Sequence, residues 1–157
     1  MCIVRKLNTI RLNSNKETLV KRYLLACCYK LVRFRSGECL PNNLEIAKRF
    51  LRGVATEKQM HKAEWEIEGQ AFGAEHYSGD RIRFYFRADK NIKHDLLQLR
   101  ISSGLRNVEA RKRLIDMAYF IDSVFCHIQF SSNWFIKDEC EVFLCPRLFR
   151  RFFGEDA

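Results

Sequence analysis

The sequence predicts a mainly α-helical protein, a compact bundle of four to five helices. Only 7 Gly and 2 Pro occur among 157 residues, so few positions force a break in a helix. Hydrophobic residues make up 47% and charged residues 30%, which is the balance of a folded globular chain. Several long segments carry apolar residues at helical spacing. The length suits a single domain over residues 1–157.

The first predicted helix runs from about residue 16 to residue 32 and contains two adjacent cysteines. Its apolar positions fall on one arc of a helix at 100° per residue. They are Val20, Tyr23, Leu24, Cys27, Cys28 and Leu31. Cys27 lies at the centre of this arc and Cys28 at its flank. We therefore expect both thiols to be buried as small hydrophobic side chains.

Two more helices are predicted from capping signals. Asn42 and Glu45 resemble a capping box before a helix that ends ahead of Gly53. Thr56 and Gln59 form the same pattern at the start of a third helix, which runs to about residue 76. The apolar stripe of this helix contains Met60, Ala63, Ile67, Ala71 and Ala74. Its small residues allow a neighbouring helix to approach closely.

The second half of the chain has a less uniform pattern. Residues 105–130 predict a long central helix, because apolar residues cover much of its circumference. RIRFYFR at 81–87 alternates apolar and basic residues and favours a strand, with a short helix as the alternative. With a hairpin over 133–145, it would add a small antiparallel β element. Pro146 suits the first turn of a basic, aromatic C-terminal helix, which either docks on its own domain or contacts a partner.

Residues 23–75 carry a pattern that suggests a family. YLLACCYKLVR, followed by NNLEIAKRFLRGVATEKQMHKAEWEIEGQAF, resembles a group of uncharacterised helical bacterial proteins most familiar from planctomycetes. The shared features are an A-C-C helix and a G-x-A-T segment that caps the next helix. The resemblance implies a helical fold, and through some relatives it implies an immunity protein. This chain departs from the family by lacking a long alanine-rich tract.

The formal net charge of +9 favours an anionic partner. If residues 81–87 form a strand, its arginines lie on one face with a tyrosine between them, where guanidinium groups can contact phosphates and the ring can stack on a base. The N-terminal third adds further cations. The candidate nucleic-acid-binding residues are Arg81, Arg83, Tyr85, Arg87, Lys21, Arg22, Lys30 and Arg33. The sequence thus favours a non-catalytic binding module for nucleic acid, with a protein-interaction module as the alternative.

Other chemistries find little support in the sequence. Adjacent cysteines diverge on a helix, and Cys140 and Cys145 are separated by four residues, so we expect no zinc site. His61, Glu64 and Glu68 have ligand-like spacing, but no second helix with matching Glu and His residues is evident. We expect no metal and no cofactor. An enzyme without a recognisable motif is a second alternative. Seven cysteines without paired spacing and no membrane-length apolar run predict a reduced, cytoplasmic protein.

Overall fold

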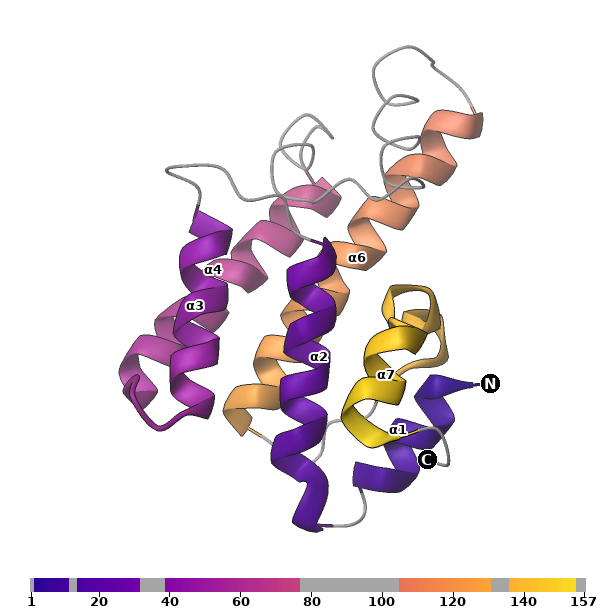
Figure 1. Cartoon of the computed structure of the whole chain (residues 1–157). Helices are drawn as coiled ribbons and strands as arrows, with labels where there is room; N and C mark the ends of the chain where they lie inside the picture. The colour runs from indigo at the N-terminus through magenta and orange to yellow at the C-terminus, as the bar shows by residue number, and fades with distance from the viewer. Residues whose placement is uncertain (1, 12–13, 32–38, 77–104, 131–135, 155–157) are drawn as a thin grey trace.

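The fold is a helical bundle, seen here in a computed structural model that describes residues 2–11, 14–31, 39–76, 105–130 and 136–154 (Figure 1). Within these ranges the chain forms six α-helices and two short 3-10 helices. The elements are α1 (Ile3–Arg11), η1 (Ser14–Lys16), α2 (Glu17–Leu31), α3 (Cys39–Leu51), α4 (Glu57–His76), α6 (Leu105–Phe130), η3 (Asp138–Phe143) and α7 (Pro146–Phe153). The prediction of a mainly α bundle is confirmed.

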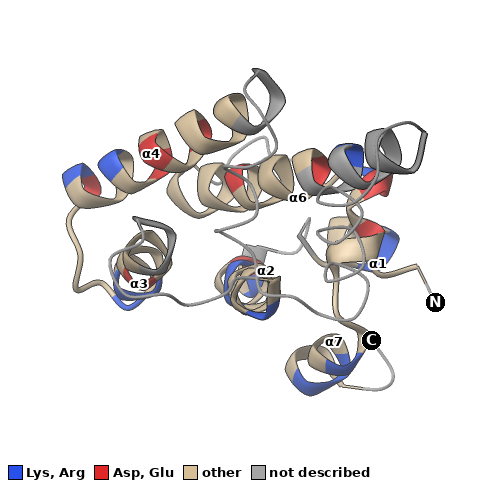
Figure 2. Cartoon of the chain, turned by 90° about the horizontal axis from the view of Figure 1, so that it is seen from above, with Lys and Arg blue, Asp and Glu red and all other residues tan. Residues whose placement is uncertain are grey.

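The helices lie in layers around α2 (Figure 2). α4 and α6 lie side by side in one layer, and α3, α2 and α1 follow in the next. α7 packs on the outer side of α2. Side chains from the first helix to the last form one contiguous hydrophobic core. Residues from both the N-terminal and the C-terminal half of the chain therefore contribute to the same core.

The predicted arc of α2 is buried throughout. Cys27 and Cys28 are 1% and 0% exposed, which confirms the expectation that both thiols are interior. Burial raises the pKa of Cys27 to about 11 and that of Cys28 well above its usual range. Neutral thiols of this kind behave as small hydrophobic groups, because the reactive form of cysteine is the thiolate.

The start of α4 follows the predicted capping box. The backbone N–H of Gln59 donates to Thr56 Oγ1 at 3.1 Å, and the backbone N–H of Thr56 donates to Gln59 Oε1 at 2.8 Å. Gly53, just after α3, has a φ of 75°, as expected past a helix C-terminus. The capping box proposed at Asn42 is wrong, because α3 already begins at Cys39. Glu45 instead accepts a hydrogen bond from the Tyr29 hydroxyl at 3.3 Å.

The hairpin expected over 133–145 is wrong for its described part. Asp138–Phe143 forms the 3-10 helix η3, and the described ranges contain no strand. This segment docks on α1 through side chains rather than through a backbone ladder. Asn8 exchanges two hydrogen bonds with the backbone of Ile136, at 3.0 and 3.2 Å. The strand predicted at 81–87 lies outside the described residues.

The C-terminal helix α7 is docked on the bundle. Phe149 is fully buried, and its ring meets Tyr23 edge-on with centroids 5.6 Å apart. The Tyr23 hydroxyl also donates to the backbone oxygen of Cys145 at 3.0 Å, just before the helix begins. This basic, aromatic segment was predicted either to dock on its own domain or to contact a partner, and the structure shows it docked on its own domain.

Candidate functional site

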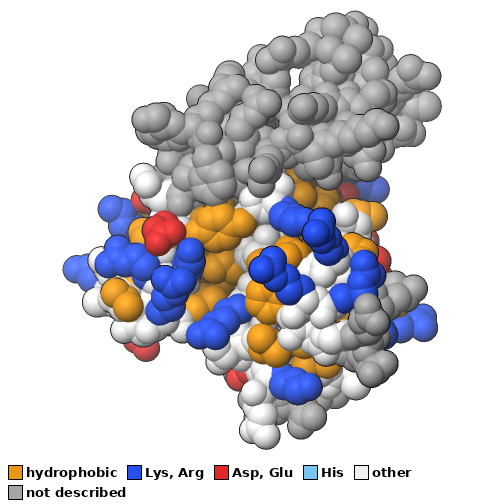
Figure 3. All heavy atoms as spheres, in the orientation of Figure 1, with side chains coloured by type: hydrophobic (Ala, Val, Ile, Leu, Met, Phe, Trp, Pro, Cys, Tyr) orange, Lys and Arg blue, Asp and Glu red, His pale blue; other side chains and the backbone are white. Residues whose placement is uncertain are grey.

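On the face of the bundle drawn in Figure 1, α2 is flanked by α3 and α7. A groove lies on this face, which Figure 3 shows with its side chains. Its volume is about 540 Å³, which falls within the usual range for sites that hold small molecules or single side chains of a partner. Its apolar wall consists of Leu25, Ala26, Tyr29, Leu51, Leu148 and Phe152. The groove exists because α7 docks beside α2 and brings Leu148 and Phe152 opposite α3.

Four cations line the same groove: Arg22, Lys30, Lys48 and Arg52. Figure 3 shows this face, on which hydrophobic side chains are bordered by Lys and Arg. Arg22, Lys30 and Arg52 are exposed, and Lys48 is half-buried. The ion pair between Lys21 and Glu17, with an N–O distance of 4.0 Å, lies outside the groove. The arrangement is an apolar surface with a positive rim.

Two residues at the groove have shifted pKa values. Burial, followed by the Glu45 carboxylate, raises the pKa of Tyr29 to about 12, so its hydroxyl stays protonated at neutral pH. Burial alone would raise the pKa of Cys145, but the backbone N–H of Leu148 and the charge of Lys30 lower it overall. Lys30 Nζ donates to Cys145 Sγ at 3.5 Å. The thiol of Cys145, which an alkylating reagent can modify, therefore lies beside Lys30 at the rim of the groove.

The structure brings together some of the predicted binding residues and not others. Arg22 and Lys30 line the groove. Lys21 does not, because it projects from another side of α2, where burial lowers its pKa and Glu17 partly offsets that effect. Arg33, Arg81, Arg83, Tyr85 and Arg87 lie outside the described residues.

Sequence reasoning missed the contribution of α3 to this site. Lys48 and Arg52 were not among the candidates, although their spacing of four residues would place both on one side of a helix. That signal concerns one helix alone. The groove also needs α7 opposite, and its position depends on contacts between residues more than a hundred positions apart, such as Tyr23 with Phe149.

Comparison of the chain with protein-family models, curated proteins and solved structures finds no match. The resemblance over residues 23–75 therefore stays a prediction. The described helices include none that is both long and apolar enough to cross a membrane.

Proposed function

We propose that this protein is a non-catalytic binding module for an anionic partner, and that the partner is single-stranded nucleic acid. The observation that carries the proposal is the groove between α2, α3 and α7, in which an apolar, partly aromatic wall is rimmed by four cations. A partner that fits it presents negative charge beside an exposed flat or apolar group. Every nucleotide of single-stranded nucleic acid has a negatively charged phosphate and an exposed flat base.

The cations support phosphate binding. Arg22, Lys48 and Arg52 make no ion pair with any acidic group among the described residues, so their charges are available to a ligand. Arginine suits this task because its planar guanidinium donates two parallel hydrogen bonds to phosphate oxygens. Contacts of this kind displace counterions from the nucleic acid, which makes the affinity depend steeply on salt.

The wall of the groove supports an unpaired strand rather than a duplex. Tyr29 and Phe152 lie among its apolar side chains, and aromatic faces stack on bases without regard to sequence. A duplex keeps its bases stacked inside and would reach only the rim. An unpaired base can enter the groove while its phosphate stays at the rim.

An acidic amphipathic helix is the second candidate partner. It is favoured by the aliphatic part of the wall, where Leu25, Leu51 and Leu148 offer the surface that binds the apolar face of a helix. Its acidic residues would meet the same cations. This candidate corresponds to a protein-interaction module, such as an immunity or defence component.

Binding of labelled ligands by fluorescence anisotropy separates these candidates. We expect a single-stranded oligonucleotide to bind at low salt, with affinity falling linearly against salt on logarithmic axes. The matched duplex should bind more weakly. A designed acidic amphipathic peptide of equal charge serves as the competing ligand. Tighter binding of the peptide than of the single strand, or no binding of the single strand at low salt, would overturn the proposal.

The Cys145 thiol gives an independent readout of where the ligand binds. It contacts Lys30 of the rim, so a ligand in the groove should slow its alkylation. Cys2 is exposed and lies on the α1 side of the molecule, where alkylation should be unchanged. Equal protection of both thiols, or of neither, would show that the ligand binds elsewhere.

A further inference from the structure

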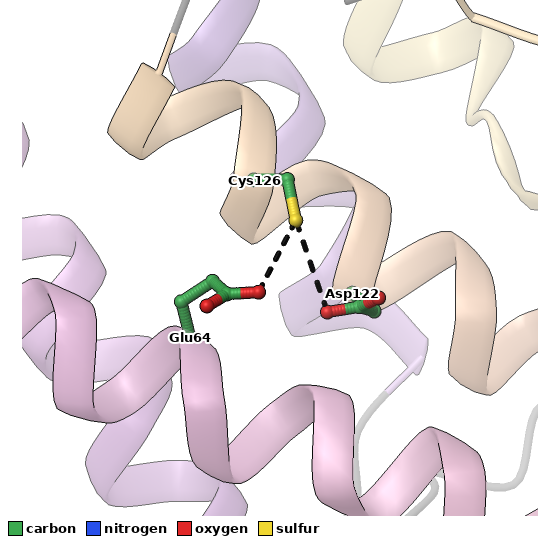
Figure 4. A group of neighbouring side chains, drawn as sticks. All are labelled: Glu64, Asp122 and Cys126. Carbon is green, nitrogen blue, oxygen red and sulfur yellow. Dashed lines mark hydrogen bonds between the residues drawn. The ribbon is translucent and has the colours of Figure 1, made fainter.

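Three potential metal ligands converge between α4 and α6, away from the groove (Figure 4). Glu64 projects from α4, and Asp122 and Cys126 project from successive turns of α6. Cys126 Sγ lies 3.2 Å from Glu64 Oε1 and 4.0 Å from Asp122 Oδ1. One donor atom from each residue lies within 4.8 Å of the other two.

The burial of Glu64 is the feature that points to a ligand. Its side chain aims into the cluster and the residue is only 6% exposed. Outside the cluster it has no hydrogen bond or ion pair with any described residue. A carboxylate removed from water costs several kcal/mol unless it is paired with a cation or coordinates a metal. Its contact here is a thiol, which is a weak donor.

The acidic groups of the cluster act on one another across the helix interface. Burial, followed by the charges of Glu64 and Glu68, raises the pKa of Asp122 to about 7. Burial, followed by the charge of Asp122, raises the pKa of Cys126 well above its usual range. The case for a ligand depends on the convergence of the three donor atoms between the two helices.

We propose that Glu64, Asp122 and Cys126 form a binding site for one Zn²⁺ ion that ties α4 to α6. One thiolate with two carboxylates is a donor set of mixed softness, which suits Zn²⁺ better than Mg²⁺ or Ca²⁺. Bonds of about 2.0–2.3 Å in a tetrahedron place ligand atoms about 3.3–3.8 Å apart. The separations of 3.2 and 4.0 Å lie on either side of that range.

Glu68 extends the site along α4. It follows Glu64 by one helical turn, is exposed, and its charge acts on both Asp122 and Cys126. Glu64 and Glu68 are four residues apart on α4, and Asp122 and Cys126 are four residues apart on α6. The two pairs thus face each other across the helix interface. This departs from the expectation of no metal, which rested on the lack of Glu and His residues on a second helix. The facing helix supplies an aspartate and a cysteine instead.

The test uses the whole chain, stripped of metal with a chelator under reducing conditions, and Co²⁺ followed by Zn²⁺ as the probes. We expect one equivalent of Co²⁺ to produce the thiolate-to-cobalt charge-transfer absorption, and Zn²⁺ to displace it. Zn²⁺ should also raise the thermal unfolding midpoint. Cys126→Ser should abolish the absorption and weaken Zn²⁺ binding by more than the roughly 10- to 100-fold that loss of an outer-shell partner costs.

Matched variants locate the site. Cys140→Ser replaces another half-buried cysteine, in η3, and should leave Co²⁺ and Zn²⁺ binding unchanged. Asp122→Asn should weaken Zn²⁺ binding while stabilising the metal-free chain, since it relieves repulsion with Glu64. The matched control is Asp116→Asn, at an exposed position of α6.

If circular dichroism shows that Cys126→Ser does not fold, the comparison of Asp122→Asn with Asp116→Asn decides whether the metal site is present. Absence of stoichiometric binding, or an absorption that survives in a folded Cys126→Ser chain or is lost in Cys140→Ser, overturns the proposal.

Discussion

The carboxylate of Glu141 caps the first turn of α1, where its Oε2 accepts the backbone N–H of Val4 at 2.8 Å. Its other oxygen accepts the backbone N–H of Ile3, also at 2.8 Å. The first N–H groups of a helix have no partner within the helix, and its dipole favours a negative charge there. One side chain in η3 thereby ties the start of the bundle to its end.

Replacement of Glu141 tests this cap. Glu141→Ala removes both acceptors and the negative charge, and should lower the free energy of unfolding by about 1–2 kcal/mol. Urea denaturation followed by circular dichroism measures this loss. Glu139→Ala, at an exposed position of the same 3-10 helix, is the matched control and should change stability by less than about 0.5 kcal/mol. Equal losses for the two variants would contradict the capping role.

The capping box of α4 makes a second, local prediction. Thr56→Ala removes the side-chain acceptor for the backbone N–H of Gln59. We expect a loss of about 1 kcal/mol in the free energy of unfolding. Thr56→Ser keeps a hydroxyl oxygen and should retain most of the stability. If alanine and serine behave alike in urea denaturation, the hydrogen bond at the helix start contributes nothing.

Docking of α7 should depend on Phe149. This ring is fully buried and contacts Tyr23 and Phe153, so Phe149→Ala should cost about 3–5 kcal/mol. Phe72→Ala, on the exposed side of α4, is the comparison and should cost much less. Thermal and urea denaturation measure both. A small loss for Phe149→Ala would mean that α7 does not contribute to the core.

The buried thiols of α2 predict a pH dependence. Unfolded cysteines titrate near their usual pKa, whereas Cys27 and Cys28 hold their protons to higher pH in the folded chain. Between about pH 9 and 11 the folded state thus binds more protons, so stability falls as pH rises, by at most about 1.4 kcal/mol per pH unit for each thiol. Urea titrations across this range should show a shallower decline for the Cys27→Ala/Cys28→Ala chain. Parallel declines would contradict the burial of these thiols.

Local sequence signals predicted much of the fold. The apolar arc of α2, the capping box of α4 and the length of α6 depend on residues within a few turns of one another, and all three are as expected. The predicted start of α3 is wrong because Asn42 and Glu45 match a capping pattern although both lie inside a helix that begins at Cys39. The hairpin prediction for the segment that forms η3 is wrong because local spacing does not show its long-range contacts. The Glu141 carboxylate of η3 accepts hydrogen bonds from the first turn of α1, at the other end of the chain.

The candidate sites were less predictable than the fold. Arg22 and Lys30 could be proposed from charge on an amphipathic helix. Their role as a rim depends on α7, which sequence spacing does not place. The same holds for Glu64 and Cys126, which are 62 positions apart and meet only because α4 packs on α6. Spacing identifies which residues share a helix face, and long-range packing decides which faces meet.

Binding by charge variants tests the central claim most directly. The chain with Arg22→Gln and Arg52→Gln loses two rim cations, and Lys58→Gln with Lys62→Gln removes two exposed cations from α4 at the same change in net charge. The measurement is the affinity of each chain for a labelled single-stranded oligonucleotide across a salt series. We expect the groove variant to bind more weakly, with a log–log salt slope smaller by about 1–2, and the α4 variant to bind like the unaltered chain. Equal losses in the two variants would contradict a specific site in the groove.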